Sequence, residues 1–202
     1  MSTPIPLILA SASPRRTELL TSVGIPHQVL VAQVVEFEDP QASPREMVLH
    51  NAKLKAEAVA KLHPEALVLG ADTTVALEHK VLNKPRDLKA SAEMLSELSG
   101  RIHTVHTGVC LCGTKYDIHE VHDITAWVRF KTLTPAVIQE YQRLVNTLDK
   151  AGAYGIQEGR DLIIEDYQRP ISTIMGLPVE FIVERLQQLG LRQRLIAGNF
   201  KS

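Results

Sequence analysis

The sequence predicts a mixed α/β fold in which an elongated sheet is flanked by helices. Two observations predict this fold: helical and strand patterns alternate over the first half of the chain, and strands rich in β-branched residues dominate its middle. With 45% of its 202 residues hydrophobic, the chain has ample apolar surface for a core. Because no repeat, low-complexity segment or linker divides it, we expect a single domain over residues 1–202.

The elements follow in order from apolar runs and from helix and turn signals. The first half is expected to hold strands at residues 5–10, 27–31, 67–77 and 81–82 and helices at residues 17–23, 45–62 and 88–98. The second half is expected to hold a long hairpin at residues 102–111 and 116–130, a helix at 134–148, a short strand at 162–164 and a last helix from Pro178 to near Gly190. The tail, residues 192–202, is expected to be loosely held.

The first strand runs directly into a helix start that carries two arginines. Ser13 is a suitable N-cap and Pro14 a suitable first helical residue. Arg15 and Arg16 lie at the positive end of the helix dipole, where cations are unfavourable unless an anion joins them. Free backbone N–H groups, the hydroxyls of Ser11 and Ser13 and two guanidinium groups together indicate a phosphate site. Taken alone, the segment also fits an ordinary capped helix with solvated arginines.

A second Ser-Pro-Arg tripeptide, at residues 43–45, provides an internal comparison. Glu46 follows it where Arg16 follows the first copy, so Ser43 and Glu46 complete a capping box. We interpret the second copy as purely structural. The first copy lacks the carboxylate and follows a buried strand, and ligands of open α/β sheets bind at the carboxyl ends of such strands.

Asp72 directly follows five apolar residues and is the strongest single catalytic candidate. A carboxylate at the end of a buried strand suits proton transfer or metal binding. The alternative is an aspartate that caps a turn, but the closely following Thr73, Thr74 and Lys84 favour a functional role.

Three further residues are candidates for a functional role only in combination with the first helix start: Lys55, Lys84 and Glu36. Either lysine could offer a mobile ammonium group to phosphate oxygens, and Glu36 could offer a carboxylate to a metal ion. Each of them alone is more typical of a solvated surface residue.

Composition and absent motifs exclude several classes of protein. A formal net charge of -1 argues against a nucleic-acid binder, so any anion site is local. No apolar run approaches the length of a membrane span and no leader peptide is recognised, so we expect a cytoplasmic protein with no membrane partner. The phosphate-binding loops of kinases and dehydrogenases and the nucleophile elbow of serine hydrolases are also missing.

Four histidines, His103, His106, His119 and His122, gather on the expected hairpin. Residues three apart on a strand point to opposite faces, so a shared metal site requires cross-strand pairing in a particular register. We favour the simpler interpretation, that these are partly exposed strand histidines.

The pattern resembles the Maf-like nucleoside triphosphate pyrophosphatases over nearly the whole chain, to about Leu189. The resemblance rests on the order and spacing of several segments: residues 9–16, Lys55-Ala56, residues 69–73, Lys84-Pro85, Leu98-Ser99-Gly100, His103 and Gly176-Leu177-Pro178. It implies a two-lobed fold around a deep cleft in which a nucleoside triphosphate is cleaved between its α and β phosphates. Members are often homodimers, and the family is associated with clearance of non-canonical nucleotides and arrest of cell division.

The resemblance also assigns roles to individual residues. It implies that Asp72 is the proton acceptor that activates water, and that Glu36 and Asp72 hold a divalent metal ion, Mg²⁺ or Mn²⁺. The residues implied to bind the phosphates are Ser11, Ser13, Arg15, Arg16, Lys55 and Lys84. Phosphoryl transfer depends chiefly on positioning and charge neutralisation, which agrees with this set of residues.

A second segment, residues 150–157, resembles the branch of the family that acts on dTTP and UTP rather than the branch that acts on 7-methyl-GTP. In that branch Arg15, Thr73 and Gln157 set base preference, and a glutamine amide can both donate to and accept from a pyrimidine. The chain departs from the family at residues 168–175 and at Asp161, next to the expected base pocket. Two alternatives remain: the same fold acting on 7-methyl-GTP or another modified nucleotide, and a regulator of division that binds nucleotide without turnover.

Overall fold

A computed structural model describes residues 3–39, 41–198 and 200. The strands are β1 (Ile5–Ala10), β2 (Gln28–Val29), β3 (Leu67–Leu77), β4 (Lys80–Leu82), β5 (Ile102–Gly113), β6 (Ile118–Phe130), β7 (Ile164–Tyr167) and β8 (Leu195–Ala197). The α-helices are α1 (Pro14–Ser22), α2 (Pro44–Ala60), α3 (Leu88–Leu98), α4 (Pro135–Leu144), α5 (Arg160–Ile163), α6 (Ile171–Ile174) and α7 (Val179–Gln188). Short 3-10 turns lie at Thr114–Tyr116, Ala151–Ala153 and Arg192–Arg194.

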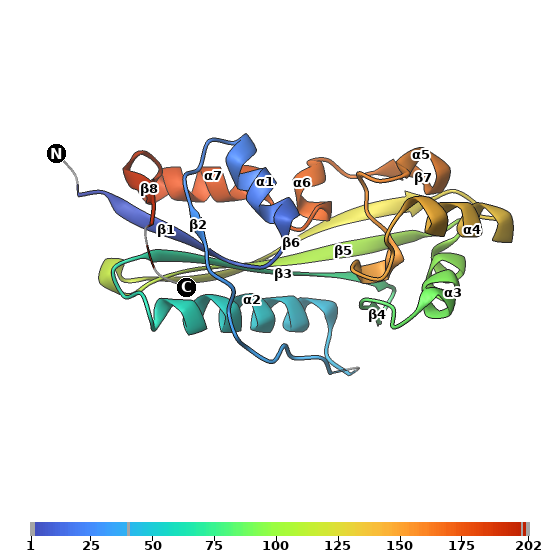
Figure 1. Ribbon diagram of the computed structural model, residues 1–202, viewed down its shortest axis with the longest axis horizontal. Helices are drawn as coiled ribbons and strands as arrows, with labels where there is room; N and C mark the ends of the chain where they lie inside the picture. The colour runs from blue at the N-terminus through green and yellow to red at the C-terminus, as the bar shows by residue number, and fades with distance from the viewer. Residues whose placement is uncertain (1–2, 40, 199, 201–202) are drawn as a thin grey trace.

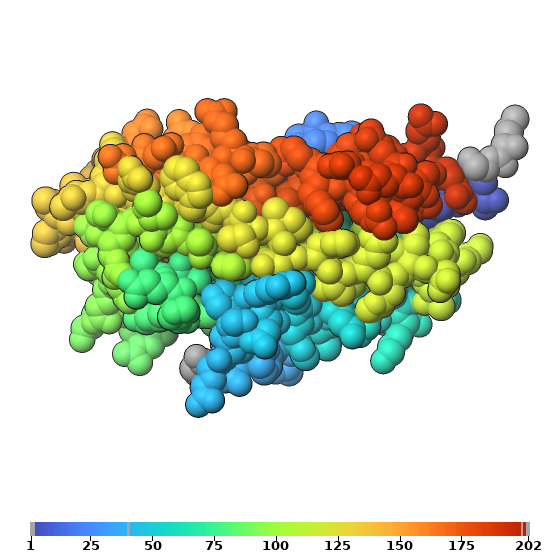
Figure 2. All heavy atoms as spheres, turned by 180° about the vertical axis from the view of Figure 1, so that it is seen from behind, coloured from blue at the N-terminus to red at the C-terminus, as the bar shows by residue number. Residues whose placement is uncertain are grey.

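All the strands belong to one open, mixed sheet, which confirms the predicted fold class. Its main path runs β2-β1-β3-β5-β6-β7, while β4 pairs with β3 and β8 pairs with β1. Strand β1 is parallel to β2, β3 and β8, and the other pairs are antiparallel. Figure 1 shows the long β3, β5 and β6 running along the molecule, with α2 on one face and α1 and α7 on the other. From behind, residues of β6 lie between α2 and α7 (Figure 2). Within the described residues, no helix combines the length and the apolar character needed to cross a membrane.

Several predicted elements agree closely with the structure. The helix at residues 88–98 and the strands at 5–10 and 67–77 have the predicted bounds, and the long hairpin is present as β5 and β6. The first helix begins at Pro14, which confirms Ser13 as the N-cap and Pro14 as the first helical residue and corrects the expected range of 17–23. The capping box is confirmed, because Ser43 Oγ accepts from Glu46 N–H and the Glu46 side chain accepts from Ser43 N–H.

Two predicted segments are wrong near the C-terminal end. Residues 162–163 close the short helix α5, and the strand begins only at Ile164, so the apolar run at 162–164 spans a helix end and a strand start. The helix expected to reach residue 148 ends at Leu144.

The tail is not loosely held in its described part. Strand β8 pairs in parallel with β1, with Leu195 opposite Ile5 and Ala197 opposite Leu7. Phe200 stacks on His63, with ring centroids 4.6 Å apart. Residues 199, 201 and 202 lie outside the described residues. A short strand that pairs with a partner some 190 positions away carries no local signal, which explains the wrong expectation.

Helix α2 packs directly on the sheet because two strand residues are glycines. A Cβ atom at Gly70 would lie 2.3 Å from the Ala52 carbonyl oxygen, and one at Gly108 would lie 2.2 Å from the Val48 carbonyl oxygen. The helix backbone therefore contacts β3 and β5 without side chains between them. This close approach positions the polar residues of α2 over the middle of β3, where Asp72 lies, and not at the strand end where the sequence predicted Asp72.

One edge of β3 is left open in the middle of the sheet. Strand β1 pairs with β3 as far as Ala10 opposite Gly70, and β4 pairs with it again only from Val75 onward. Because β5 occupies the other side of β3 throughout, residues 71–74 have, within the described chain, no strand neighbour on this side. A gap between strands of this kind lets side chains from both faces of the sheet reach one opening, although Ala71, Asp72 and Thr74 are themselves buried.

Candidate active site

A cleft of about 410 Å³ opens at this gap. Its walls come from the end of β1, the start of α1, the loop before α2, β3 and the loops after β4, α4 and α6. All ten residues to which the resemblance gives a role in catalysis, binding or base preference line it: Ser11, Ser13, Arg15, Arg16, Glu36, Lys55, Asp72, Thr73, Lys84 and Gln157. Its volume is in the range of sites that bind small organic molecules.

Asp72 and Thr73 are neighbours on β3 but face opposite sides of the sheet. Asp72 points to α2, where it contacts Asn51 and Lys55. Thr73 points to the other face, where it contacts Arg16. Side chains alternate along a strand, so the open edge presents a carboxylate to one half of the cleft and a hydroxyl to the other.

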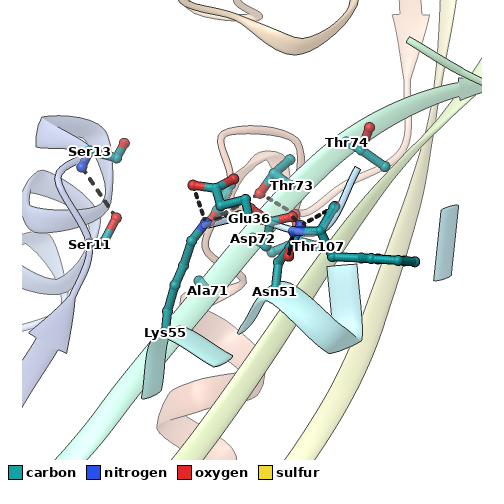
Figure 3. Close-up of polar contacts among 12 residues, drawn as sticks. Ser11, Ser13, Glu36, Asn51, Lys55, Ala71, Asp72, Thr73, Thr74 and Thr107 are labelled. Atoms are coloured by element: carbon teal, nitrogen blue, oxygen red, sulfur yellow. Dashed lines mark hydrogen bonds and ion pairs between the residues drawn. The ribbon is translucent and has the colours of Figure 1, made fainter. Parts of the chain in front are cut away.

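A lysine ammonium group joins two of the acidic side chains that line the cleft. Lys55 Nζ lies 2.7 Å from Asp72 Oδ1 and 3.0 Å from Glu36 Oε1 (Figure 3). The Lys55 and Asp72 side chains are 11% and 12% exposed, whereas Glu36 is 48% exposed. The two carboxylates thus converge on one cation. Among the described residues no group of three or more His, Cys, Asp or Glu side chains is arranged to hold a metal ion.

Asn51 completes this side of the site and was missed by sequence reasoning. Its Nδ2 donates to Asp72 Oδ2 at 3.2 Å and to the Phe37 carbonyl at 3.1 Å, and its Oδ1 accepts from the Phe37 N–H at 2.7 Å. The fully used amide ties the loop that carries Glu36 to Asp72. Asn51 precedes Lys55 by one helical turn, and that spacing was the signal that could have found it.

Arg16 is buried and directed inward, toward the sheet. Its Nε donates to the Gly176 carbonyl at 2.8 Å, one terminal nitrogen donates to Ser11 Oγ at 3.0 Å and to the Ala71 carbonyl at 2.9 Å, and the other donates to Thr73 Oγ1 at 3.1 Å. Four of the five N–H groups of the guanidinium are therefore used inside the protein. The contact with Ala71 satisfies a carbonyl at the open edge of β3.

Burial lowers the pKa of the Arg16 guanidinium from its ordinary value, while the nearby carboxylates of Asp72 and Glu36 act in the opposite direction. A guanidinium remains charged after such a shift. Arg16 therefore brings a fixed positive charge beneath the start of α1. Ser13, at the N-cap of this helix, makes no side-chain capping hydrogen bond, and its N–H donates to Ser11 Oγ at 3.2 Å.

Lys84 and Gln157 are exposed side chains on the walls of the cleft. The loop before Gln157 is held by Lys150, whose ammonium lies 2.8 Å from Asp149 Oδ1 and 3.2 Å from Glu158 Oε1. Only 4% of the Lys150 side chain is exposed. Sequence reasoning gave Lys150 no separate role, because burial of a lysine depends on tertiary packing.

The expectation of partly exposed strand histidines is wrong for His103. It is 2% exposed, and its Nε2 forms a hydrogen bond of 2.8 Å with the Tyr154 hydroxyl. Burial lowers the pKa of His103 to about 3, so the ring is neutral. His103 packs edge-on against Phe130 and belongs to the core rather than to the cleft.

Comparison with known proteins adds the decisive observation. The model of the family described as Maf-like protein matches residues 6–189 of the chain. The chain belongs to the Maf-like protein family. The relatives of this Maf-like chain include proteins named dTTP/UTP pyrophosphatase. One from Akkermansia muciniphila is 42% identical over 187 residues, which cover 93% of this chain and 98% of the relative. Others are from Exiguobacterium sibiricum, 42% identical over 95% of this chain and 96% of the relative, and Bacillus cytotoxicus, 40% identical over 90% and 94%.

Proposed function

We propose that this protein hydrolyses dTTP and UTP to the nucleoside monophosphate and pyrophosphate. Membership of the Maf-like family and the names of its relatives support this activity. The observation that carries it is the convergence of Asp72, Glu36 and Lys55 in a cleft at the start of α1. The nucleotide pools of the cytoplasm are the proposed setting.

Asp72 is proposed as the group that takes a proton from water. An ionised carboxylate has about four acceptor positions, and here Lys55 and Asn51 use one on each oxygen. The remaining positions are free to accept from a water molecule. The hydrogen bond from Asn51 holds the carboxylate plane in one orientation, so that little reorganisation is needed when the proton is transferred.

The phosphates are proposed to lie over the start of α1. Arg15, Lys55 and Lys84 supply mobile cations, and Ser11 and Ser13 supply hydroxyl and backbone donors. Arg16 has one N–H group left after its internal hydrogen bonds, so it contributes mainly a fixed charge. In this arrangement the charge lies close to the phosphates, and burial limits its screening by water.

The two carboxylates of the site suit Mg²⁺ or Mn²⁺. Glu36 and Asp72 already converge on the single cation of Lys55, and Mg²⁺ is commonly held by one or two carboxylates together with substrate phosphates. Such an ion, when bound, would neutralise charge on the phosphate oxygens. Arg15, Thr73 and Gln157 are proposed to face the base.

The test is pyrophosphate release from a panel of nucleotides in the presence of Mg²⁺ or Mn²⁺. We expect turnover of dTTP and UTP, and a loss of about 10²- to 10⁴-fold in kcat for Asp72→Asn with an unchanged melting temperature. Asp161→Asn is the matched control, because that carboxylate is 97% exposed and, contrary to the expectation from the sequence, does not line the cleft. Wild-type turnover by Asp72→Asn would refute the role of Asp72. A clear preference for 7-methyl-GTP or another purine, or tight binding without pyrophosphate release, would support the alternative functions instead.

A further inference from the structure

The segment that carries Glu36 is attached to the rest of the protein at few points. Residues 31–39 form neither helix nor strand. Within the described residues, the polar contacts of residues 31–38 are those of the Phe37 backbone with Asn51 and the ion pair of Glu36 with Lys55. Because the Glu36 side chain is 48% exposed, its position depends on what holds its neighbour Phe37.

Asn51 holds Phe37 by both backbone groups of that residue. Its Oδ1 accepts from the Phe37 N–H at 2.7 Å, and its Nδ2 donates to the Phe37 carbonyl oxygen at 3.1 Å. The side-chain amide thus pairs with the loop as a neighbouring strand would. A backbone N–H only donates and a carbonyl oxygen only accepts, so these two contacts determine which end of the amide is the oxygen.

The orientation that the loop requires also directs the second N–H of the amide to Asp72. Asn51 Nδ2 lies 3.2 Å from Asp72 Oδ2 (Figure 3). Asn51 is 2% exposed and lies on α2, which packs directly on the sheet at Gly70 and Gly108. One buried side chain on a fixed helix therefore contacts both the catalytic candidate and the loop that carries the second carboxylate.

We propose that Asn51 is a positioning residue that holds Glu36 beside Asp72 and thereby sets the affinity of this carboxylate pair for a divalent cation. This inference rests on the proposed function, in which the pair holds Mg²⁺ or Mn²⁺. A loop that occupies the binding position for only part of the time raises the apparent dissociation constant by the inverse of that fraction. Residues that orient the ligands of a metal ion typically change its affinity by about 10- to 100-fold.

The experiment measures Mn²⁺ binding with and without the three hydrogen bonds of Asn51. Asn51→Leu removes all three at a similar side-chain size. Titration with Mn²⁺ alone, followed by electron paramagnetic resonance, gives the dissociation constant, and pyrophosphate release from UTP gives the half-saturating Mn²⁺ concentration and kcat. We expect both Mn²⁺ constants to rise by about 10- to 100-fold. Most of the lost kcat should return at saturating Mn²⁺, whereas general damage to the fold would lower kcat at every Mn²⁺ concentration.

Hydrogen exchange at the Phe37 N–H tests the loop contact without metal or nucleotide. This N–H should be protected in wild type and should exchange at least about tenfold faster in Asn51→Leu. His50→Leu is the matched control, because His50 precedes Asn51 on α2 and contacts the same Phe37 through its ring, with centroids 5.0 Å apart. This variant should leave both Mn²⁺ constants unchanged and the Phe37 N–H protected.

Thermal melting shows whether Asn51→Leu folds, and Asn51→Ala, which needs less space, replaces it if it does not. The inference is overturned by an unprotected Phe37 N–H in wild type, by the absence of Mn²⁺ binding to wild type, or by unchanged Mn²⁺ constants in a folded Asn51 variant. It is also overturned if His50→Leu raises the constants as much as Asn51→Leu.

The same measurements separate this inference from the proposed function. In each outcome that overturns the inference, pyrophosphate release from UTP by wild type still supports the proposed function. If wild type releases no pyrophosphate from UTP, the proposed function fails. The inference is then decided by Mn²⁺ binding and by exchange of the Phe37 N–H, which need no turnover.

Discussion

Two helices of this protein begin with the same tripeptide, Ser-Pro-Arg, and differ in the residue that follows. At α2 the fourth residue is Glu46, which closes the capping box with Ser43 on the exposed surface. At α1 the fourth residue is Arg16, which turns inward to the sheet edge, and the N-cap Ser13 makes no side-chain capping bond. The start of α2 uses its capping groups within the helix, whereas the start of α1 leaves the Ser13 side chain free of a capping hydrogen bond.

The difference supports the proposal that α1 begins at an anion site, because its N-cap side chain makes no capping hydrogen bond inside the helix. A carboxylate at the fourth position supplies the negative charge that the helix dipole favours. An arginine at that position adds positive charge, and its burial prevents solvent from screening that charge fully. The predictions below separate the two starts, from the largest expected effect to the smallest.

Arg16→Met should cause the largest change. It removes the donors to the Ala71 and Gly176 carbonyl groups and to the hydroxyls of Ser11 and Thr73, so we expect the free energy of unfolding to fall by about 2 to 4 kcal/mol and pyrophosphate release to be nearly abolished. Urea unfolding and the activity assay measure the two effects. Arg45→Met removes the exposed arginine of the second start, which is the counterpart of Arg15, and should alter neither. Equal effects at both positions would remove the distinction between the two helix starts.

Arg15→Met should separate binding from folding. Arg15 lines the cleft, and a lost hydrogen bond between charged groups corresponds to a rise of about 10- to 100-fold in KM for dTTP and UTP. The free energy of unfolding should change by less than about 0.5 kcal/mol. Steady-state kinetics and urea unfolding test both statements. An unchanged KM would exclude Arg15 from substrate binding.

The two N-cap serines should respond in opposite ways to substitution by alanine. Ser43→Ala removes a capping bond and should cost about 1 kcal/mol of stability with unchanged KM. Ser13→Ala removes no such bond, so it should cost less than about 0.5 kcal/mol and raise KM. Parallel unfolding and kinetic measurements decide the question. A stability loss at Ser13 as large as that at Ser43 would make the first start an ordinary cap.

The smallest expected effect is a pH dependence of stability that belongs to α2 alone. Hydrogen bonds from the Ser43 hydroxyl and then from the Ser43 backbone lower the pKa of Glu46 below its ordinary value of 4.5. A lowered carboxyl pKa stabilises the fold above the unfolded-state pKa, and this contribution disappears as pH falls through the folded-state value. Urea unfolding between pH 6 and 3 should therefore show a slightly smaller acid loss in Ser43→Ala than in wild type. Identical pH profiles would contradict this.

Local patterns predicted the parts of the molecule that depend on local interactions. Strand β1, helix α3 and the capping box at Ser43 each follow from neighbouring residues, and their outcomes agree with the structure. The sequence also selected Asp72, Arg15 and Arg16, which line the cleft, because a carboxylate after an apolar strand and arginines at a helix start are unusual in themselves.

Residues whose importance depends on strand register could not be predicted in this way. Asn51 lies on Asp72 only because Gly70 and Gly108 let α2 approach the sheet. The inward direction of Arg16 likewise depends on where β1 stops along β3. Such contacts depend on how distant segments pair, and this pairing produces no hydrophobic periodicity that can be recognised in the sequence.

The open edge of β3 has a consequence for self-association. Unpaired backbone along a strand is a template on which another chain can add its own strand, and long exposed edges lead to aggregation. Here the unpaired stretch, residues 71–74, is bounded by β1 and β4, and Arg16 occupies the Ala71 carbonyl. These four residues are too few and too recessed for a strand of another chain to pair with them, whereas a small molecule can enter the cleft. The sheet can thus contain an unpaired stretch of strand in its middle without offering other copies of the chain an edge on which to pair.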